Sequence, residues 1–339
     1  MSPHPSLAPT DPATAVKAER FLSLVADKLA ATEELFRRTL DSDVPFIHQA
    51  GAYIAAGGGK RMRPALLLLC SQLLGHDGDE EVSYAAVVEL LHNSTLIHDD
   101  IIDHANLRRG RRTLNELWGN SLTVLLGDWM YATAMRTALA HDNVVVITRL
   151  CDATLAMTEG ELLSLERLGD STLTRAQYLD IIDRKTAHLF SAACGIPALI
   201  PPARPEAQAA LERYGRALGL CFQIVDDLLD FTGEEGRLGK PVLSDLKEGK
   251  LTLPLIAVRD RVGPERWKRV EWVLEDRDFV RVEPRQILEL AREAGGLDEA
   301  AALALEQASA AKAALAGFPP SAAREALELA PDFVLHRRS

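Results

Sequence analysis

From Ala15 onward, apolar residues recur at the three- and four-residue spacing of amphipathic helices almost without interruption. No convincing strand-like alternation appears, and the aromatic content is only 5% while alanine and leucine dominate. We therefore expect an all-α fold. The first 15 residues are rich in proline, serine and alanine and are expected to be disordered, which leaves residues 16–339 as a single domain.

Several long helices are expected, separated by stretches rich in glycine, proline or arginine. The predicted helices span residues 84–103, 121–140, 175–194 and 205–231, with Thr174 as the N-cap of the third. The predicted breaks fall at 57–59, 108–112, 200–205 and 233–241.

The formal net charge of −11 argues against nucleic acid as a partner, because phosphate backbones attract basic surfaces. The N-terminus has no apolar signal-peptide core, and no stretch is long and apolar enough to span a membrane. The cysteines stand in apolar helical contexts, so we expect buried, reduced thiols and a cytoplasmic protein; they are Cys70, Cys151, Cys194 and Cys221.

Two clusters of aspartates, with the same spacing, follow apolar helical stretches. The first is Asp99, Asp100 and Asp103, and the second is Asp226, Asp227 and Asp230. Residues four apart share a helix face, and carboxylates this close repel one another unless a cation lies between them. Each cluster precedes an expected loop, where negative charge also opposes the helix dipole. The all-oxygen ligand set favours Mg²⁺.

Basic residues gather near these acids and at a glycine turn. Gly57–Gly59 is followed by Lys60, Arg61 and Arg63 at an expected helix start, where backbone N–H groups suit phosphate. The segment 108–112 adds four arginines just after the first aspartate cluster. Further cations are Lys185, Lys240 and Lys250.

Six motifs then identify a family resemblance. GGGKRMRP, LIHDDIIDHANLRRG, LLGDWMY, RKTAHLF, CFQIVDDLLDF and GKPVLSDLKEGKLTLPL occur in this order and resemble the trans-isoprenyl diphosphate synthase (polyprenyl synthetase) family. The resemblance implies an antiparallel helix bundle around a deep central cavity, usually a homodimer. It also implies head-to-tail condensation of isopentenyl diphosphate onto an allylic diphosphate, such as geranyl or farnesyl diphosphate.

The resemblance also implies roles for individual residues. Asp99, Asp103 and Asp226 match Mg²⁺ ligands, Asp100 supports the first motif, and Asp227 and Asp230 act mainly through water. The positions that match the isopentenyl diphosphate site are Lys60, Arg63, His92 and Arg109. Those that match the allylic side are Arg108, Lys185, Thr186, Gln223, Lys240 and Lys250. About three Mg²⁺ ions are expected in each site. Ser164 and Arg112 depart from the family pattern.

This assignment agrees with elementary chemistry. Diphosphate leaves once Mg²⁺ and basic side chains stabilise its developing charge. The allylic cation needs dry, apolar walls and receives oxygen dipoles from Thr186 and Gln223. No dedicated protein base is evident, and the released diphosphate accepts the proton. A terpene cyclase would usually lack the second aspartate motif, and a non-catalytic partner subunit would be expected to lose aspartates.

Product length should depend on the residues one to two turns before Asp99, because a helix rises about 1.5 Å per residue and these positions line successive depths. They include Leu91, Ser94 and Thr95, none of them aromatic. Ser94 and the tail from His336 to Arg338 resemble long-chain members, so we predict an octaprenyl-type product (about C40) for a respiratory quinone. Tyr131 and Met135 are candidates for the cavity floor, and a C15–C20 product is the main alternative.

Overall fold

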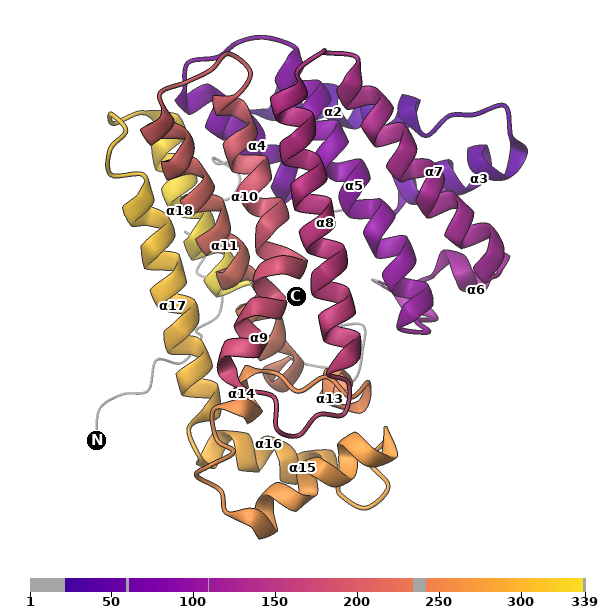
Figure 1. Ribbon diagram of the computed structural model, residues 1–339, viewed down its shortest axis with the longest axis vertical. Helices are drawn as coiled ribbons and strands as arrows, with labels where there is room; N and C mark the ends of the chain where they lie inside the picture. Colours follow the sequence, from indigo (N-terminus) through magenta and orange to yellow (C-terminus); the bar gives the residue numbers. More distant parts are fainter. Residues whose placement is uncertain (1–21, 59–60, 109, 234–241, 338–339) are drawn as a thin grey trace.

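The computed structural model describes residues 22–58, 61–108, 110–233 and 242–337, and helices dominate these segments (Figure 1). Lys60, Arg109 and Lys240 lie outside the described residues, as do residues 1–15. The α-helices are α2 (Ala26–Thr39), α3 (Pro45–Ala56), α4 (Met62–Leu73), α5 (Glu80–Ile102), α6 (Leu114–Trp118), α7 (Asn120–Leu139), α8 (Val144–Glu166), α9 (Arg175–Ile182), α10 (His188–Gly195), α11 (Pro205–Thr232), α13 (Ser244–Lys247), α14 (Leu253–Ile256), α15 (Pro264–Asp276), α16 (Pro284–Glu293), α17 (Gly296–Ala314) and α18 (Ala322–His336).

The expected all-α fold is confirmed, with two local corrections. The segment predicted as one helix over 175–194 is interrupted, because a π-helical turn, η1 (Asp183–Ala187), separates α9 from α10. The segment 108–112, expected to be a loop, belongs to a small antiparallel hairpin of β1 (Leu107–Arg108) and β2 (Arg111–Arg112). A two-residue strand is too short to produce a visible alternation in the sequence. A 3₁₀ turn, η2 (Ile196–Ala198), follows α10.

Local sequence signals explain where several helices begin. Thr174 caps α9 as predicted, and its hydroxyl and the Gln177 side chain form a reciprocal capping box. Glu80 and Glu81 occupy the first turn of α5, where negative charge complements the helix dipole. Pro205 begins α11 at a position that needs no N–H donor.

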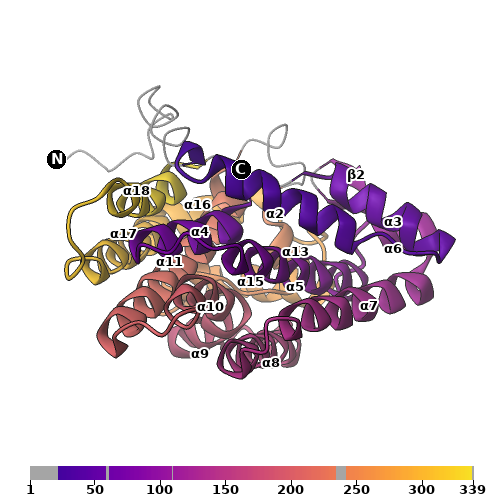
Figure 2. The ribbon, with the colours of Figure 1, turned by 90° about the horizontal axis from the view of Figure 1, so that it is seen from above.

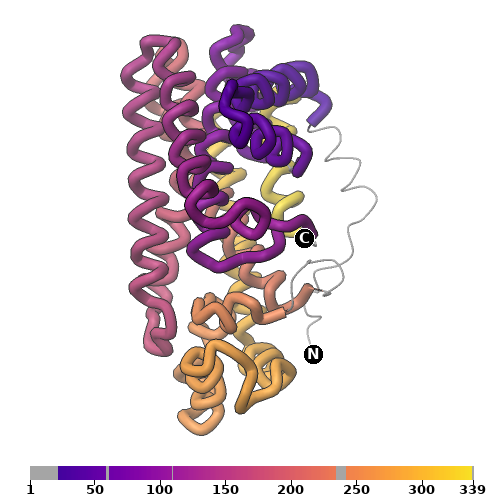
Figure 3. Tube along the Cα trace, turned by 90° about the vertical axis from the view of Figure 1, so that its right-hand side faces the viewer, coloured from indigo at the N-terminus to yellow at the C-terminus, as the bar shows by residue number. Residues whose placement is uncertain are grey.

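The helix α5 lies in the interior, with α2 over one side and α7 beside it (Figure 2). Its middle turns are almost fully enclosed, and Tyr84, Val87 and Leu90 have no exposed surface. Buried apolar side chains form one hydrophobic cluster that extends from Val25 to Leu335. The helix α8 runs along one edge of the molecule (Figure 3).

Two glycines let α11 approach η1 and α10 closely. A Cβ atom at Gly215 would lie 2.4 Å from the carbonyl oxygen of Phe190, and one at Gly219 would lie 2.6 Å from the Cα of Ala187. Such separations exclude any side chain, so glycine is required at both positions. This close approach brings the C-terminal half of α11 beside η1, which is where the candidate site forms.

The cysteine prediction is correct for three of the four residues. Cys70, Cys194 and Cys221 are buried, whereas Cys151 is exposed on α8, and all four are free thiols. The expectation for Cys151 failed because the outward face of α8 is itself apolar, so its surroundings in the sequence look like a core. Within the described residues, none of the helices has the length and apolar character needed to cross a membrane.

Candidate active site

The first aspartate cluster occupies the last turn of α5, as predicted, with Asp103 as the C-cap residue. Asp100 and Asp103 are each paired with a cationic side chain. Arg108 Nε donates to Asp100 Oδ1 at 2.6 Å, and Lys250 Nζ donates to Asp103 Oδ1 at 2.8 Å. Lys250 comes from a segment 147 residues away in the chain. The fold therefore brings Arg108 and Lys250, two of the predicted cations, to the first cluster.

The surroundings of Asp99 disfavour its ionised form. Burial raises the pKa of Asp99 to about 6, and Glu161 and Asp103 add to the rise while Lys185 and Arg108 oppose it. A carboxylate held in this way gains from any further positive charge. This is an observation that fits a divalent cation at this position.

Lys185 stands opposite the first cluster and contacts Glu161 of α8. Burial acts to lower the pKa of Lys185, but Asp99 and Glu161 outweigh it, so the pKa is raised and the ammonium stays charged. A Cβ atom at Gly160 would lie 2.6 Å from the backbone nitrogen of Lys185, so glycine lets α8 reach η1. The sequence did not lead us to predict Glu161 as a site residue. Its position directly after Gly160, a glycine within a helix, is the feature that could have identified it.

The second cluster ends α11, as predicted, and each of its aspartates has different neighbours. Asp226 Oδ1 accepts from Arg337 Nη2 at 2.9 Å. Asp227 accepts from Tyr178 and Gln223. The buried carboxylate of Asp230 accepts from the side chain and backbone of Ser244 and from the backbone N–H of Asp245, at the start of α13. Asp230 thus holds the start of α13 against the end of α11.

Thr186 and Gln223 lie together, from η1 and α11. Thr186 Oγ1 donates to Gln223 Oε1 at 2.8 Å. The π-helical turn inserts an extra residue into the helix and places consecutive side chains toward different partners, a feature frequent at functional sites. Here Lys185 contacts Glu161 of α8 near the first cluster, while its neighbour Thr186 contacts Gln223, a partner of Asp227 in the second.

The glycine turn leads into α4, as expected, and its two described arginines have different surroundings. Arg61 adopts a left-handed backbone conformation with φ of 45° and is bound by Glu33 and by Glu89, the latter at 2.5 Å. Arg61 therefore links the start of α4 to α2 and α5. The guanidinium of Arg63 lies 4.4 Å from the ring centre of Phe190. His92, another predicted substrate residue, is half-buried on α5.

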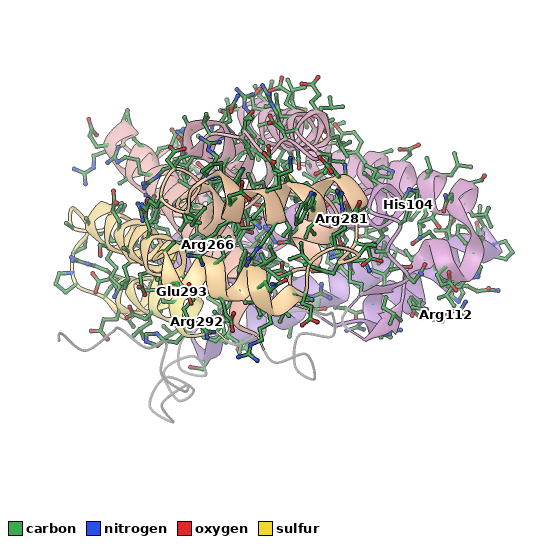
Figure 4. The ribbon with its side chains drawn as sticks, turned by 90° about the horizontal axis from the view of Figure 1, so that it is seen from below. His104, Arg112, Arg266, Arg281, Arg292 and Glu293 are labelled. Atoms are coloured by element: carbon green, nitrogen blue, oxygen red, sulfur yellow. The ribbon has the colours of Figure 1, made fainter. Side chains whose placement is uncertain are left out.

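The hairpin separates its arginines. Arg108 turns toward Asp100, whereas Arg112 Nη2 contacts Glu116 at 2.9 Å at the periphery of the molecule, and its carbonyl accepts from the Tyr53 hydroxyl at 2.7 Å (Figure 4). The same view from below shows Arg266 close to Glu293, 2.8 Å apart, on the outer surface formed by α15 and α16. These outer cations belong to surface ion pairs and not to the site.

The predicted chain-length residues fall into an interior and an outer group. Leu91 and Ser94 are buried on α5, and the Ser94 hydroxyl donates to the Leu91 carbonyl at 2.8 Å. Thr95 is half-buried, and Met135 packs against the core from α7. Tyr131 is 36% exposed on the outer side of α7, near Cys151.

The aspartates offer part of a metal site. In the part of the chain that the structure describes, no three His, Cys, Asp or Glu side chains converge closely enough to hold an ion by themselves. All candidate donors of the two clusters are hard carboxylate oxygens, a set that suits Mg²⁺ when phosphate or water oxygens complete the coordination.

Comparison with known proteins agrees with this geometry. The family model described as polyprenyl synthetase matches residues 44–290. The octaprenyl diphosphate synthase of Escherichia coli (strain K12) is 37% identical over 310 residues, covering 91% of this chain and 95% of that protein. A short chain isoprenyl diphosphate synthase of Methanothermobacter thermautotrophicus is 35% identical over 313 residues, covering 90% and 95%.

A solved structure is also similar along nearly the whole chain. The polyprenyl synthase from Caulobacter crescentus CB15, complexed with calcium and isoprenyl diphosphate, gives a TM-score of 0.90 at 38% identity. The match covers 95% of this chain and 98% of that one.

Proposed function

Because this chain belongs to the polyprenyl synthetase family and is a trans-prenyl diphosphate synthase, we propose that it adds isopentenyl diphosphate head-to-tail to geranyl or farnesyl diphosphate. We further propose a long all-trans product of octaprenyl type that supplies a quinone side chain. One observation carries the proposal. The acid cluster at the end of α5 is paired with cations of the hairpin and of the segment before α14, Lys185 of η1 lies near it, and Asp226 of the cluster at the end of α11 pairs with Arg337.

Mg²⁺ is the proposed metal, with Asp99, Asp103 and Asp226 as its protein ligands. The raised pKa of Asp99 supports this, since the buried carboxylate is short of positive charge. Mg²⁺ usually takes one or two carboxylates and completes its shell with substrate phosphate and water, which suits these incomplete clusters. When bound, the ions would neutralise charge on the departing diphosphate.

The protein residues would share the remaining work of ionisation. Lys185, Lys250 and Arg108 lie beside the first cluster and would stabilise the allylic diphosphate as it leaves. The oxygens of Thr186 and Gln223 would face the allylic cation. Apolar turns of α5 and α11 exclude water around it. Arg63 and His92, with the undescribed Lys60 and Arg109, are the proposed contacts of isopentenyl diphosphate.

The long product is supported by the small residue at a buried position of α5 and by the similarity to octaprenyl diphosphate synthases. Ser94 leaves room where an aromatic side chain would fill the interior. Met135 is the better-placed floor residue, because Tyr131 is partly exposed. A shorter C15–C20 product is the main alternative, and relatives named as short chain synthases are nearly as similar. A cyclase or a non-catalytic subunit is disfavoured, because both aspartate clusters are complete.

A homodimer is also part of the proposal. The outward faces of α7 and α8 carry an exposed apolar surface that a second copy of the chain would cover. Leu125 is 63% exposed, Leu155 61% and Val144 70%. Three further residues of this surface are more than a third exposed: Leu122, Leu139 and Leu162. We place the enzyme in the cytoplasm, as one domain, because its thiols are unpaired and its core is continuous.

Product analysis tests the proposal directly. The purified chain is incubated with Mg²⁺, labelled isopentenyl diphosphate and farnesyl or geranyl diphosphate, and its products are separated by reversed-phase chromatography. We expect Mg²⁺-dependent diphosphate release and a polyprenyl product. Asp99→Ala and Asp226→Ala should each abolish most turnover while the helical content stays unchanged. Near-normal turnover of either variant at saturating Mg²⁺ would contradict the two-cluster mechanism.

A further inference from the structure

A continuous hydrogen-bond chain runs through the site from α9 to η1. Tyr178 OH donates to Asp227 Oδ2 at 2.6 Å. Gln223 Nε2 donates to the other carboxylate oxygen, Asp227 Oδ1, at 2.8 Å. Thr186 Oγ1 then donates to Gln223 Oε1 at 2.8 Å. Tyr178 is 3% exposed and Asp227 4%, so water does not compete for this part of the chain.

The direction of the chain fixes the orientation of the Gln223 amide. Tyr178 and Gln223 donate to different oxygens of Asp227. Because a carboxylate accepts hydrogen bonds and does not donate them, the NH₂ group of Gln223 must be the end that faces Asp227. The amide oxygen must then point the other way, toward Thr186. As a result the negative end of the amide dipole is turned toward the Thr186 hydroxyl. The reversed amide would present N–H groups there instead.

We propose that Tyr178 is a positioning residue that acts through Asp227 to hold the Gln223 carboxamide with its oxygen toward the allylic cation. This inference rests on the proposed function. The hydroxyl of Tyr178 binds one oxygen of the Asp227 carboxylate and fixes the orientation of the carboxylate plane. The other oxygen, which accepts from Gln223, is therefore held in a single position. Asp227 then serves the orientation of Gln223, while its neighbour Asp226 remains available to the metal. Tyr178 itself touches no substrate.

A purely structural role for Tyr178 is the competing explanation, since a buried tyrosine hydroxyl needs a partner in any protein. The chain contains a matched case. Tyr214 is fully buried, and its hydroxyl donates to the Leu327 carbonyl at 2.7 Å, away from the chain just described. Tyr214→Phe removes the same atom and one hydrogen bond from the same kind of environment. It therefore measures what the loss of a buried hydroxyl does on its own.

The experiment compares steady-state kinetics of wild type, Tyr178→Phe, Tyr214→Phe, Gln223→Ala and the double variant Tyr178→Phe/Gln223→Ala. We expect Tyr178→Phe to lower kcat about tenfold, with both KM values within about twofold, because the lost orientation matters in the transition state. Tyr214→Phe should stay within about twofold of wild type. In the Gln223→Ala background, Tyr178→Phe should have no further effect, since its target is gone.

Three outcomes would overturn the inference while leaving the proposed function intact. They are equal effects of Tyr178→Phe and Tyr214→Phe, a Tyr178→Phe effect that persists undiminished without Gln223, and a change in KM alone. Melting temperatures are recorded for every variant. If Tyr178→Phe folds poorly, Asp227→Asn, which breaks the same hydrogen-bond chain at its middle, replaces it in the double-mutant comparison with Gln223→Ala. An inactive wild type would instead contradict the proposed function.

Discussion

The guanidinium of Arg337, the last described residue, lies 2.9 Å from the carboxylate of Asp226 and stacks 3.9 Å from the ring centre of Phe222. Its side chain is only 5% exposed, and its Nη2 also donates to the Phe222 carbonyl at 2.8 Å. Burial lowers the pKa of Arg337, and Asp226 opposes that change. The C-terminus thus supplies positive charge to a proposed metal ligand in the substrate-free protein.

We expect Arg337→Ala to tighten the binding of Mn²⁺ to the substrate-free enzyme by about three- to tenfold, because the guanidinium and the ion compete for Asp226. Isothermal titration without substrate measures this. Arg324→Ala is the control, since it removes an arginine of α18, the helix that ends just before Arg337, and this arginine pairs with Glu328 instead. Unchanged or weaker Mn²⁺ binding in Arg337→Ala would mean that the two cations do not compete.

The buried charge of Asp99 should make stability depend on pH in a defined direction. A carboxyl whose folded pKa is raised binds more protons when folded, so its contribution to stability falls as the pH rises from the ordinary pKa of 3.8 to the folded pKa of about 6 and is fully lost above that value. Asp99→Asn should therefore raise the melting temperature of the metal-free protein at pH 8 and change it much less at about pH 4. Exposed Asp152 on α8 provides the control, Asp152→Asn. Equal shifts at both pH values would show that the charge of Asp99 is already compensated.

Arg63 and Lys185 should separate the two substrate sites. We expect Arg63→Ala to raise the apparent KM for isopentenyl diphosphate about tenfold or more. Lys185→Ala should chiefly impair the allylic substrate, because Lys185 stands beside Asp99 and Glu161. Initial rates with each substrate varied in turn measure both. Arg281→Ala, which removes an arginine from the face of Trp272 on the outer surface, should leave both KM values unchanged. Identical effects of Arg63→Ala and Lys185→Ala on both substrates would refute this division.

The size of the side chain at position 94, in the interior part of α5, should determine product length. Wild type is expected to make an octaprenyl-type product, and Ser94→Phe a shorter one, because a phenyl ring fills the space below the aspartates. Reversed-phase analysis of labelled products decides this. Ser309→Phe is the control: Ser309 makes the same bond to its own helix, with Oγ 2.9 Å from the Leu305 carbonyl, but is exposed on α17. A wild-type product that stops at C15 or C20 would contradict the long-chain prediction. If Ser94→Phe still makes the wild-type product, length is limited elsewhere.

The apolar surface of α7 and α8 should hold two copies of the chain together. We expect sedimentation velocity to give a dimer for wild type and a monomer for Leu155→Glu, since a buried unpaired charge would destabilise the interface. Leu305→Glu, at a residue 47% exposed on α17, should leave the dimer intact. Dimers of Leu155→Glu as stable as wild type would place the interface on another surface.

The sequence was sufficient for features that depend on local pattern. The helices over 84–103, 121–140 and 205–231 and the cap at Thr174 are present because periodicity and capping are encoded within a few residues. Contacts between distant segments were not accessible in this way. Arg337 and Asp226 are 111 residues apart, and Tyr178 and Asp227 are 49 apart, so only the packing of whole helices brings them together.

The exposed Cys151 and the left-handed backbone conformation of Arg61 show a second limit of prediction from sequence. An exposed apolar helix face looks the same in sequence as one that the rest of the chain covers. The guanidinium of Arg61 is bound by Glu33 and Glu89, and neither acid is close to it in sequence. No local sequence pattern identifies either feature.

The π-helical turn at Asp183–Ala187 has a consequence for how this region tolerates change in length. An α-helix turns by about 100° per residue, so deleting one residue here would restore a regular helix and rotate everything before the deletion relative to everything after it. Tyr178 would then lose Asp227, or Thr186 would lose Gln223, even though no contacting side chain had been altered. A substitution at Arg184, which belongs to this turn but pairs with Glu159 and Asp180 outside the site, should thus be far better accepted than a single-residue deletion or insertion between residues 183 and 187, in natural variants and in engineered libraries alike.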